Sequence, residues 1–455
     1  MDSNAKPELT VEDGVLIGSS CGNVLGDKVA VSFDGRPWAT VPSSSRPEQG
    51  GRIFRCTLPP VPEGASGSGT ISVADLFGEP LAKVVIPSRR DRVNAYGVSA
   101  SRVLSLCDRP FFAVPYLSFD GAVLTLGGSH LPPGGDPSAL SVEFGPGVAY
   151  DFRYPLESPE WARHFWYWPN AAMSNFQLAI DLAASARGSS PFTFRFRYRT
   201  ANGEALPEPH GRVWIPSDLA SGVGLPTDPT QLTRVQTWSD SRSVTLTGYN
   251  HFRVIQALFA RHGVSPDRRQ TVLDWGCGHG RVTRHMIREW RNSSVIGMDV
   301  DADNVAWASA NLVPGRFVHS PLMPPCPLND GTVDAVFSVS VMTHLAPDVQ
   351  QAWLNDLARI VRPDGIVLMS FGGPGAVAWS SVWNGPEYLD AFFRDGFHAD
   401  QADHALRDQI SDSSYYRNVA QTHEHVRREW AKYFEIVEIL HEAIGNLDVA
   451  VLRRR

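Results

Sequence analysis

The stretch Thr271-Val-Leu-Asp-Trp-Gly-Cys-Gly-His-Gly-Arg281 decides how the second half of this 455-residue chain folds. Its first three residues form an apolar run that is typical of a buried strand. Gly276, Gly278 and Gly280 then alternate with other residues, and a segment with helical spacing follows Arg281. A strand, a glycine-rich turn and a helix N-terminus together form a backbone-lined pocket that a ligand can approach closely. The stretch therefore predicts a ligand-binding loop in an α/β domain.

The spacing of the glycines distinguishes between two kinds of ligand. A dinucleotide-binding loop has the pattern G-x-G-x-x-G, in which the last glycine packs the helix against the strand. Here the pattern is G-x-G-x-G, and Arg281 stands where that last glycine belongs. Together with the preceding Asp274, the loop resembles the first motif of class I S-adenosylmethionine-dependent methyltransferases. An NAD-dependent oxidoreductase is disfavoured, and a structural glycine turn in another α/β domain is the alternative.

The resemblance implies a set of cofactor contacts in and around this loop. In the family, the loop wraps the methionine half of S-adenosylmethionine, and a helix ahead of it often covers the cofactor. The predicted helix over 249–262 has this position. The residues that the resemblance places at the cofactor are Asp274, Gly276, Cys277, Gly278, Gly280 and Arg281, with Tyr249 as a further candidate.

The next predicted strand, 294–299, ends in Asp299. A carboxylate at such a strand end can accept both hydroxyl hydrogens of a ribose, and Asp299 follows Gly278 by 299 − 278 = 21 residues, the length of one βαβ step. By resemblance, Val300 and Asp301 flank the adenine, although Asp301 is equally suited to cap the next helix. The adenine-reading acid that many relatives carry after the third strand, 316–319, is missing here. His319 and Ser320 are the candidates that remain at that position.

The segment Ser340-Val-Met-Thr-His-Leu345 follows a fourth predicted strand and resembles the fourth motif of the family. Ligands in such sheets bind outside the carboxyl ends of the strands, so Ser340 is expected near the cofactor. His344 is the candidate general base, because imidazole titrates near neutral pH. A structural hydrogen bond to a neighbouring helix is the alternative role for this histidine.

Two alternating runs, 434–440 and 447–452, predict the antiparallel strand pair that closes class I sheets. With the preceding Tyr415-Tyr-Arg-Asn418, this tail resembles bacterial methyltransferases encoded with polysaccharide and glycosyltransfer systems. That resemblance implies an acceptor side formed by Tyr415, Arg417 and His423, together with Tyr416 and His425. Ordinary packing or surface positions are the alternative for each of these side chains.

The N-terminal half has short runs of alternating polarity separated by Pro, Gly and Ser clusters. We interpret residues 1–94 and 95–225 as two β-sandwich (Ig-like) domains, 226–244 as a linker and 245–455 as an α/β Rossmann-like class I methyltransferase domain. Two features of the second sandwich have both a functional and a structural interpretation. Arg195, Arg197 and Arg199 share one face of a strand and could bind an anionic polymer or be solvated. The run Phe165–Trp168 could stack on sugar rings or belong to the core.

Composition excludes some classes of function. The formal net charge of −7 gives no overall attraction to nucleic acid. The five cysteines show no metal-ligand spacing, and we expect no metal. The sequence has neither a secretion signal at Met1 nor an apolar run of the ~20 residues that a membrane span needs, so a cytoplasmic protein is expected.

These observations predict a metal-independent O-methyltransferase that acts on a sugar hydroxyl of a bacterial glycan or related metabolite. The alternative is a methyltransferase for a non-sugar small molecule or a protein, with the β-domains as docking modules. In either case the β-sandwich domains are candidates for contacts with a protein partner or a second copy of the chain.

Overall fold

The computed structural model describes residues 6–12, 15–21, 25–33, 36–46, 51–57, 69–86, 93–107, 109–132, 140–168, 170–182, 192–200, 202–217, 219, 225–235, 241–380, 384–403, 405–406, 408–412 and 415–455. The chain forms two compact units. The first unit comprises Met1–Gly188, Phe194–Gly211 and Ala378–Pro386. The second comprises Ser189–Thr193, Arg212–Val377 and Glu387–Arg455. No helix in the described ranges is both long enough and apolar enough to cross a membrane.

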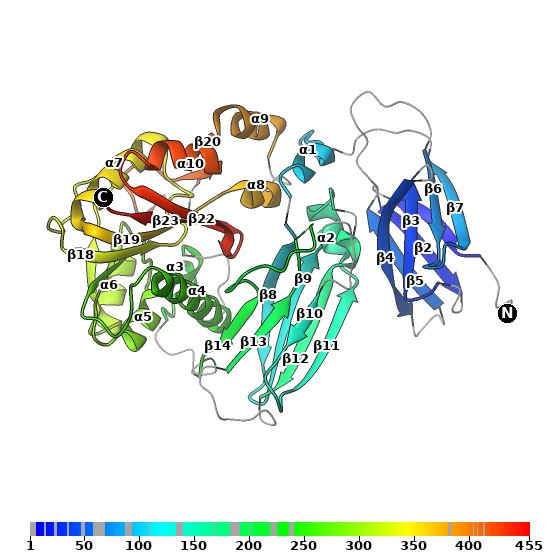
Figure 1. Ribbon diagram of the computed structural model, residues 1–455, viewed down its shortest axis with the longest axis horizontal. Helices are drawn as coiled ribbons and strands as arrows, with labels where there is room; N and C mark the ends of the chain where they lie inside the picture. The colour runs from blue at the N-terminus through cyan, green and yellow to red at the C-terminus, as the bar shows by residue number, and fades with distance from the viewer. Residues whose placement is uncertain are drawn as a thin grey trace. The chain divides into compact units, whose positions relative to one another are not determined.

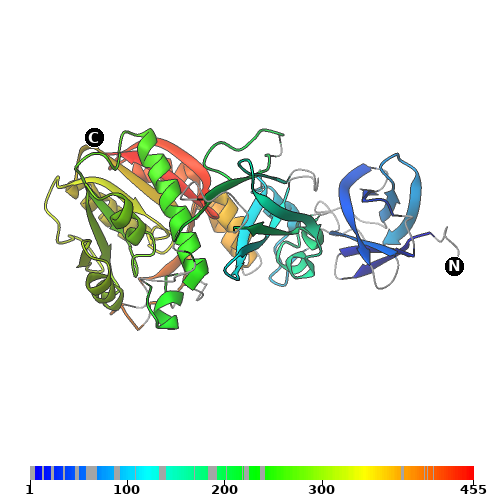
Figure 2. The same ribbon diagram turned by 90° about the horizontal axis from the view of Figure 1, so that it is seen from below.

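The first unit begins with one seven-stranded sheet of order β1-β2-β5-β4-β3-β6-β7. Its strands are β1 (Glu8–Glu12), β2 (Val15–Cys21), β3 (Lys28–Phe33), β4 (Arg36–Arg46), β5 (Gly51–Thr57), β6 (Gly69–Ala74) and β7 (Pro80–Ile86). The long β4 pairs first with β3 and then, from Ser43 onward, with β5, so one strand joins two half-sheets. Figure 2 shows this sheet curling around on itself. Strand content is as predicted, but one curled sheet replaces the two separate sheets of an Ig-like sandwich.

A second group of strands in the first unit packs two sheets face to face. It contains β8 (Phe111–Phe119), β9 (Val123–Leu131), β10 (Ser141–Glu143), β11 (Ala149–Leu156), β12 (Asn175–Asp181) and β13 (Phe192–Arg197), with α1 (Ala100–Leu104), α2 (Pro159–His164) and the 3₁₀ helix η3 (Ala171–Met173). The four-stranded sheet has the order β11-β12-β9-β8, and β10 pairs with β13 in the other sheet. The Phe196 ring of β13 lies 5.0 Å from both Phe112 and Phe176 of the four-stranded sheet. The aromatic face predicted for β13 therefore fills a core between two sheets.

The arginine face of β13 is engaged within the chain. Arg195 donates to the carbonyls of residues 206 and 210 and pairs with Glu208. Arg197 forms an ion pair with Glu143 (2.7 Å), and Arg199 donates to a backbone carbonyl (3.0 Å). These partners favour the structural interpretation of this face over binding of an anionic polymer.

The aromatic run Phe165–Trp168 is also structural. All four side chains are buried. The Tyr167 hydroxyl donates to the carbonyl of Ala378 (2.9 Å), and the Trp168 indole N–H donates to that of Pro132 (3.0 Å). Rings that are buried in this way have no face to offer to a sugar, which favours the core interpretation.

The second unit is built around a seven-stranded sheet of order β17-β16-β15-β18-β19-β23-β22. The strands of this sheet are β15 (Thr271–Trp275), β16 (Ser294–Asp299), β17 (Arg316–His319), β18 (Val333–Ser338), β19 (Val361–Phe371), β22 (Glu435–Ile444) and β23 (Leu447–Arg453). The unit also contains β14 (Arg212–Ile215) and a separate pair of strands, β20 (Phe397–Ala402) and β21 (Arg417–Gln421). Its helices are α3 (Pro229–Thr233), α4 (Ser241–Arg261), α5 (Thr283–Glu289), α6 (Ala302–Asn311), α7 (Pro347–Ile360) and α10 (His423–Trp430). Helices α8 (Pro374–Ser380) and α9 (Pro386–Asp395) have residues in both units.

This sheet has the predicted topology. The strands from β17 to β19 are mutually parallel, whereas β23 runs antiparallel to β19, and β22 antiparallel to β23. Figure 1 shows β18, β19, β23 and β22 side by side in that order. Alternate strand residues are buried on opposite faces: Val272 packs with α4 and α5, and Leu273 with α7 and α10. Strands covered on both faces explain the continuous apolar runs in the sequence.

The predicted linker, 226–244, is partly helical. Helix α3 lies inside it, and α4 begins at Ser241, earlier than the predicted start at 249; residues 236–240 lie outside the described part. Asp228 caps α3 by accepting from the backbone N–H of Thr230 (2.9 Å), and Pro229 occupies the first helical position. The Asp-Pro pair that reads as a loop signal is also a helix-start signal, and the structure uses the second meaning.

Candidate functional site

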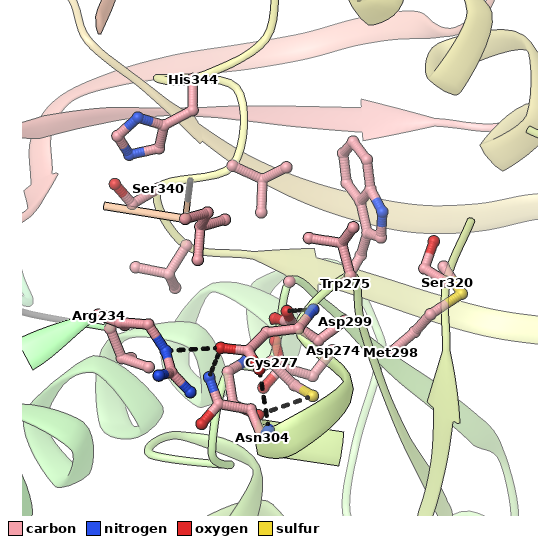
Figure 3. Close-up of a pocket in the computed structure, with 18 of the residues that line it drawn as sticks. Arg234, Asp274, Trp275, Cys277, Met298, Asp299, Asn304, Ser320, Ser340 and His344 are labelled. Carbon is pink, nitrogen blue, oxygen red and sulfur yellow. Dashed lines mark hydrogen bonds and ion pairs between the residues drawn. The ribbon is translucent and has the colours of Figure 1, made fainter. Parts of the chain in front are cut away.

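A pocket lies at the carboxyl ends of β15, β16 and β18, the edge predicted from the glycine loop (Figure 3). Its wall includes the predicted residues Asp274, Gly276, Cys277, Gly278, Arg281, Asp299, Val300, Ser340, His344 and Tyr415. It also includes Arg234, Val235, Trp275, Val282, Met298, Asp301, Asn304, Ser320, Pro321, Val339, Val341, Leu345, Trp353, Leu406 and Tyr416. The structure thus gathers most of the predicted cofactor residues in one place.

The three loop glycines all have the left-handed backbone that was expected. The φ angles of Gly276, Gly278 and Gly280 are +78°, +53° and +80°. A Cβ on Gly276 would lie 2.1 Å from Val341 and one on Gly280 2.3 Å from Leu312. The glycines are therefore required by both backbone conformation and packing, and the space beside them is filled by side chains of the chain itself.

Asp274 and Arg281 place opposite charges in the wall beneath the loop. Asp274 accepts a hydrogen bond from the Thr283 hydroxyl (2.5 Å), and burial raises its pKa to about 7. Arg281 is 8% exposed and contacts His251 Nδ1 (3.2 Å), while burial lowers its pKa to about 10. The Arg281 Nε is buried and has no hydrogen-bond partner among the described residues. A buried donor without a partner is costly, so this donor of a wall residue is a candidate contact for a ligand.

Asp299 stands at the end of β16, at the rim of the loop. Its carboxylate accepts from the backbone N–H groups of Gly278 (2.6 Å) and Asp301 (2.8 Å). Burial outweighs these hydrogen bonds and raises the pKa of Asp299 to about 6. The carboxylate is thus held between two backbone segments with its remaining lone pairs available at the pocket wall.

Two roles were expected for Asp301, capping the next helix and flanking the adenine, and the structure shows the helix cap. It caps α6 by accepting from the backbone N–H groups of Asp303 (3.0 Å) and Asn304 (3.1 Å). It also accepts from Arg234 Nε (2.9 Å). Arg234 lies in the predicted linker and was not anticipated. The two candidate adenine contacts also separate, because Ser320 is buried in the pocket wall whereas His319 is exposed and contacts the Val300 carbonyl.

Ser340 begins the loop after β18 with strained backbone. Its φ angle is +64°, a region that residues with a side chain adopt rarely. Its backbone N–H donates to Ser370 (2.7 Å), and its hydroxyl contacts that of Thr343 (2.9 Å). These contacts hold the strained residue at the pocket, a combination found often at functional sites.

His344 stands near Ser340 in Figure 3, and its ring is fixed on two sides. The ring stacks on Tyr416 with centroids 4.0 Å apart, and Nδ1 lies 3.1 Å from the carbonyl oxygen of Arg417. A carbonyl only accepts, so Nδ1 carries the proton in the neutral ring and Nε2 carries the lone pair. Burial lowers the pKa of His344 to about 4, although Asp403, 3.6 Å from Nδ1, opposes that shift.

Six predicted site residues lie outside this pocket wall: Tyr249, Gly280, His319, Arg417, His423 and His425. His425 is buried in α10, with its ring 4.8 Å from that of Phe397. Tyr249 is buried in the core of α4, with its ring 5.1 Å from that of His285. Gly280 supports the loop without facing the pocket. The guanidinium of Arg417 donates to the carbonyl of residue 399 (2.8 Å), and His423 bonds to Asp448. Arg417 therefore contributes to the site through its backbone carbonyl instead of its side chain.

Several wall residues were missed by the sequence reasoning. Leu406 comes from the segment between β20 and β21, and Trp353 comes from the buried stripe of α7. Asp403, from the same segment as Leu406, is not part of the wall but lies 3.6 Å from Nδ1 of the wall residue His344. The Trp353 indole N–H donates to the hydroxyl of Tyr415 (3.1 Å). Helical spacing correctly indicated a core position for Trp353, but it does not show that one edge of the ring reaches a pocket.

Comparison with known proteins agrees with this geometry. Residues 272–365 match the family model for a methyltransferase domain. The second unit contains a class I methyltransferase domain. The match supports the cofactor expected from the sequence, S-adenosylmethionine.

Relatives with assigned names match this domain over part of their length. Trans-aconitate 2-methyltransferase of Azoarcus sp. is 30% identical over 131 residues, 29% of this chain and 49% of the relative. Fatty-acid O-methyltransferase of Mycolicibacterium smegmatis is 30% identical over 105 residues, 23% of this chain and 37% of the relative. The chain thus spans about half or less of these relatives. The solved 1,6-didemethyltoxoflavin-N1-methyltransferase of Burkholderia thailandensis is 18% identical, with 57% of this chain and 95% of that chain covered at a TM-score of 0.34.

Proposed function

We propose that this chain transfers a methyl group from S-adenosylmethionine to an oxygen atom, and that the acceptor is a sugar hydroxyl of a bacterial glycan or a related metabolite. The observation that carries the choice of oxygen is His344. Its Nδ1 is engaged by the Arg417 carbonyl, so its Nε2 has the lone pair that a hydroxyl proton requires.

The pocket offers a complementary group for each part of the cofactor. Asp299 suits the ribose hydroxyls, and Val300 and Ser320 lie where the adenine is expected. Arg281, with its unpartnered Nε, suits the methionine carboxylate, and Asp274 suits the ammonium group. When bound, the cofactor supplies an already activated methyl group, so the protein chiefly aligns the acceptor with it.

His344 is arranged to take up a proton. Its low pKa keeps the ring neutral at physiological pH, so Nε2 is ready to accept. Protonation makes an imidazolium, which the Arg417 carbonyl and the Asp403 carboxylate stabilise from the Nδ1 side. A base this weak removes a hydroxyl proton only as the oxygen becomes bonded to the methyl carbon. The stacked Tyr416 ring keeps the imidazole oriented meanwhile.

A carboxylate acceptor is the second candidate. Two named relatives are a trans-aconitate methyltransferase and a fatty-acid O-methyltransferase, and both trans-aconitate and fatty acids bear carboxyl groups. A carboxylate oxygen is already deprotonated and needs no base. His344 would then position the acceptor, and the β-rich first unit would serve as a docking module for the acceptor, a protein partner or a second copy.

The test measures methyl transfer from labelled cofactor to panels of glycans and carboxylic acids, with the product and its linkage identified by mass spectrometry. We expect a methylated sugar hydroxyl, and a kcat reduced about 10²–10⁴-fold in His344→Gln with an unchanged cofactor Kd. His262→Gln, a histidine outside the pocket wall that pairs with Glu438, is the control. Methylation of carboxylates alone, with His344→Gln raising the acceptor KM but leaving kcat unchanged, would support the second candidate instead. Folded protein that gives no calorimetric signal with the cofactor would overturn both.

A further inference from the structure

A cluster of two histidines and an aspartate lies in the second unit, outside the pocket wall. It consists of His423 at the start of α10, His441 on β22 and Asp448 on β23. One possible ligand atom from each lies within 4.8 Å of the others. We propose that these three side chains bind a divalent transition-metal ion, with Zn²⁺ the best match. The proposal is independent of the proposed methyl acceptor.

The side chains converge because three separate elements meet at the cluster. Asp448 pairs with Phe371 at the end of β19, and its side chain is buried. The His423 Nε2 contacts one oxygen of Asp448, and the His423 and His441 ring centroids are 4.3 Å apart. No pair of ligands is close in sequence, which is why the spacing of residues along the chain gave no metal signal.

An irregularity in β22 helps to aim His441 at the cluster. The pairing register with β23 shifts between Leu440 and Ile444, and Glu442 has a φ angle of +44°. The backbone N–H of Glu442 donates to the other oxygen of Asp448 (2.8 Å). Bulges of this kind often redirect a side chain. The carboxylate is thereby fixed on one side by backbone while its second oxygen faces the histidines.

Two glycines in the neighbouring loop keep the cluster open. A Cβ on Gly373 would lie 1.9 Å from Asp448 Oδ2, and one on Gly375 would lie 2.1 Å from Glu442 Oε1. Any larger residue at these positions would displace the two carboxylates. The loop sequence Gly372-Gly373-Pro374-Gly375 is therefore matched to the cluster beside it.

The donor set selects the kind of metal. Two imidazole nitrogens and one carboxylate oxygen suit Zn²⁺ and its neighbours in the first transition row, whereas Mg²⁺ and Ca²⁺ prefer oxygen ligands alone. Ligand atoms of a tetrahedral zinc are roughly 3.4 Å apart, given bonds of about 2.0–2.1 Å. The most distant ligand atoms, up to 4.8 Å apart, need to approach by about 1.4 Å. His423 Nε2 and Asp448 Oδ2 need to move apart, so that their hydrogen bond is replaced by two metal bonds. Three protein ligands leave a fourth position for water or another ligand.

The cluster is linked to the proposed base by one short strand. In β21, the backbone N–H of Arg417 bonds to the His344 carbonyl (3.0 Å), and that of Gln421 bonds to the Gly372 carbonyl (2.9 Å). His423 follows Arg417 by 423 − 417 = 6 residues, at most about 20 Å of extended chain. A metal ion here would fix the end of the strand whose beginning holds His344.

The test titrates the full, chelator-treated chain with ZnCl₂ in a calorimeter and follows CoCl₂ binding by visible absorption. We expect one Zn²⁺ per chain, a Co²⁺ spectrum with imidazole coordination, and affinity at least about 100-fold weaker in His441→Gln and Asp448→Asn. His262→Gln is the matched control, because His262 pairs with Glu438 (3.0 Å) as a single histidine and carboxylate.

Circular dichroism of each variant shows whether it has lost only a metal ligand or also its fold. A rise in the Tm of the wild-type chain on addition of zinc is a second measurement of binding and requires no variant. Absence of both zinc heat and the cobalt spectrum in folded wild-type protein would overturn the proposal. So would a folded His441→Gln chain that binds Zn²⁺ as the wild type does, or binding of Mg²⁺ in preference to Zn²⁺.

Discussion

Arginine side chains occur in two contrasting settings in this chain. On β13 in the first unit, Arg195 is largely buried, and its donors are used by Glu208 and two backbone carbonyls. At the pocket in the second unit, Arg281 is equally buried, but its Nε has no partner among the described residues. The fold satisfies the first arginine, whereas the second contacts His251 through Nη1 and keeps one buried donor unpaired. A buried charged side chain is thus a stronger indication of a ligand site when one of its donors has no hydrogen-bond partner in the fold than when all its donors are used.

The largest expected effect concerns the carboxylate that faces the same pocket. Asp299→Ala should weaken S-adenosylmethionine binding about 100-fold, since two hydrogen bonds to a charged acceptor are lost, each worth about 1.5–3 kcal/mol. Calorimetry measures the Kd, and Asp348→Ala, an exposed acid of α7, is the control. Unchanged affinity in Asp299→Ala would show that the ribose lies elsewhere.

The comparison itself is tested by exchanging each arginine for methionine, which preserves much of the side-chain volume. Arg281→Met should weaken cofactor binding about 10–100-fold and cost less stability than Arg195→Met, because the fold uses only its contact with His251 and leaves its Nε unpaired. Arg195→Met should leave the Kd unchanged and lower the free energy of unfolding by about 1–3 kcal/mol. Urea unfolding and calorimetry on both variants give the four values. A weaker cofactor Kd in Arg195→Met, or a larger loss of stability in Arg281→Met, would contradict the distinction between the two arginines.

A smaller effect is expected from pH. The pKa of Asp274 is raised to about 7 by burial, so the carboxylate is mostly ionised above pH 7 and protonated below it. The ionised form attracts the cofactor ammonium, and affinity should therefore fall about tenfold between pH 8 and pH 6. Asp299, with a pKa of about 6, adds to the loss at the acid end. Asp274→Asn should flatten the upper part of this profile, and a wild-type Kd independent of pH would contradict the assignment.

The smallest difference expected, about 1–2 kcal/mol between two glycine variants, tests how far packing around the pocket loop contributes to stability. Gly263 and Gly280 have nearly the same φ angle, +79° and +80°, but only the second has a neighbour, Leu312, that an added Cβ would strike. Gly263→Ala should cost about 1 kcal/mol for backbone strain, and Gly280→Ala about 2–3 kcal/mol because Leu312 must also move. If urea unfolding gives the same loss of unfolding free energy for both variants, the contact between Leu312 and the loop does not add to stability.

Local sequence signals predicted the second unit well because its elements depend on short-range patterns. The β15 run, the alternating glycines and the acid at Asp299 each report on a few adjacent residues, and the structure places them as expected. Side chains brought from distant segments were not predictable in this way. Arg234, Asp403 and the His423 cluster meet their partners only through tertiary folding, and Arg417 reaches the site with its carbonyl, which any residue could supply.

The division of the chain into two units has a consequence for its synthesis. Trp379, from the C-terminal half of the sequence, belongs to the first unit, where its ring stacks on Phe111 (4.6 Å) and contacts Phe165 (5.1 Å). A ribosome therefore releases most of the first unit long before the residue that completes this aromatic cluster has emerged. Until the strands of the second unit and then Trp379 have been synthesised, Phe111 and Phe165 lack the ring that packs on them in the folded protein. Expression of residues 1–225 alone should for this reason yield a chain that aggregates or recruits chaperones.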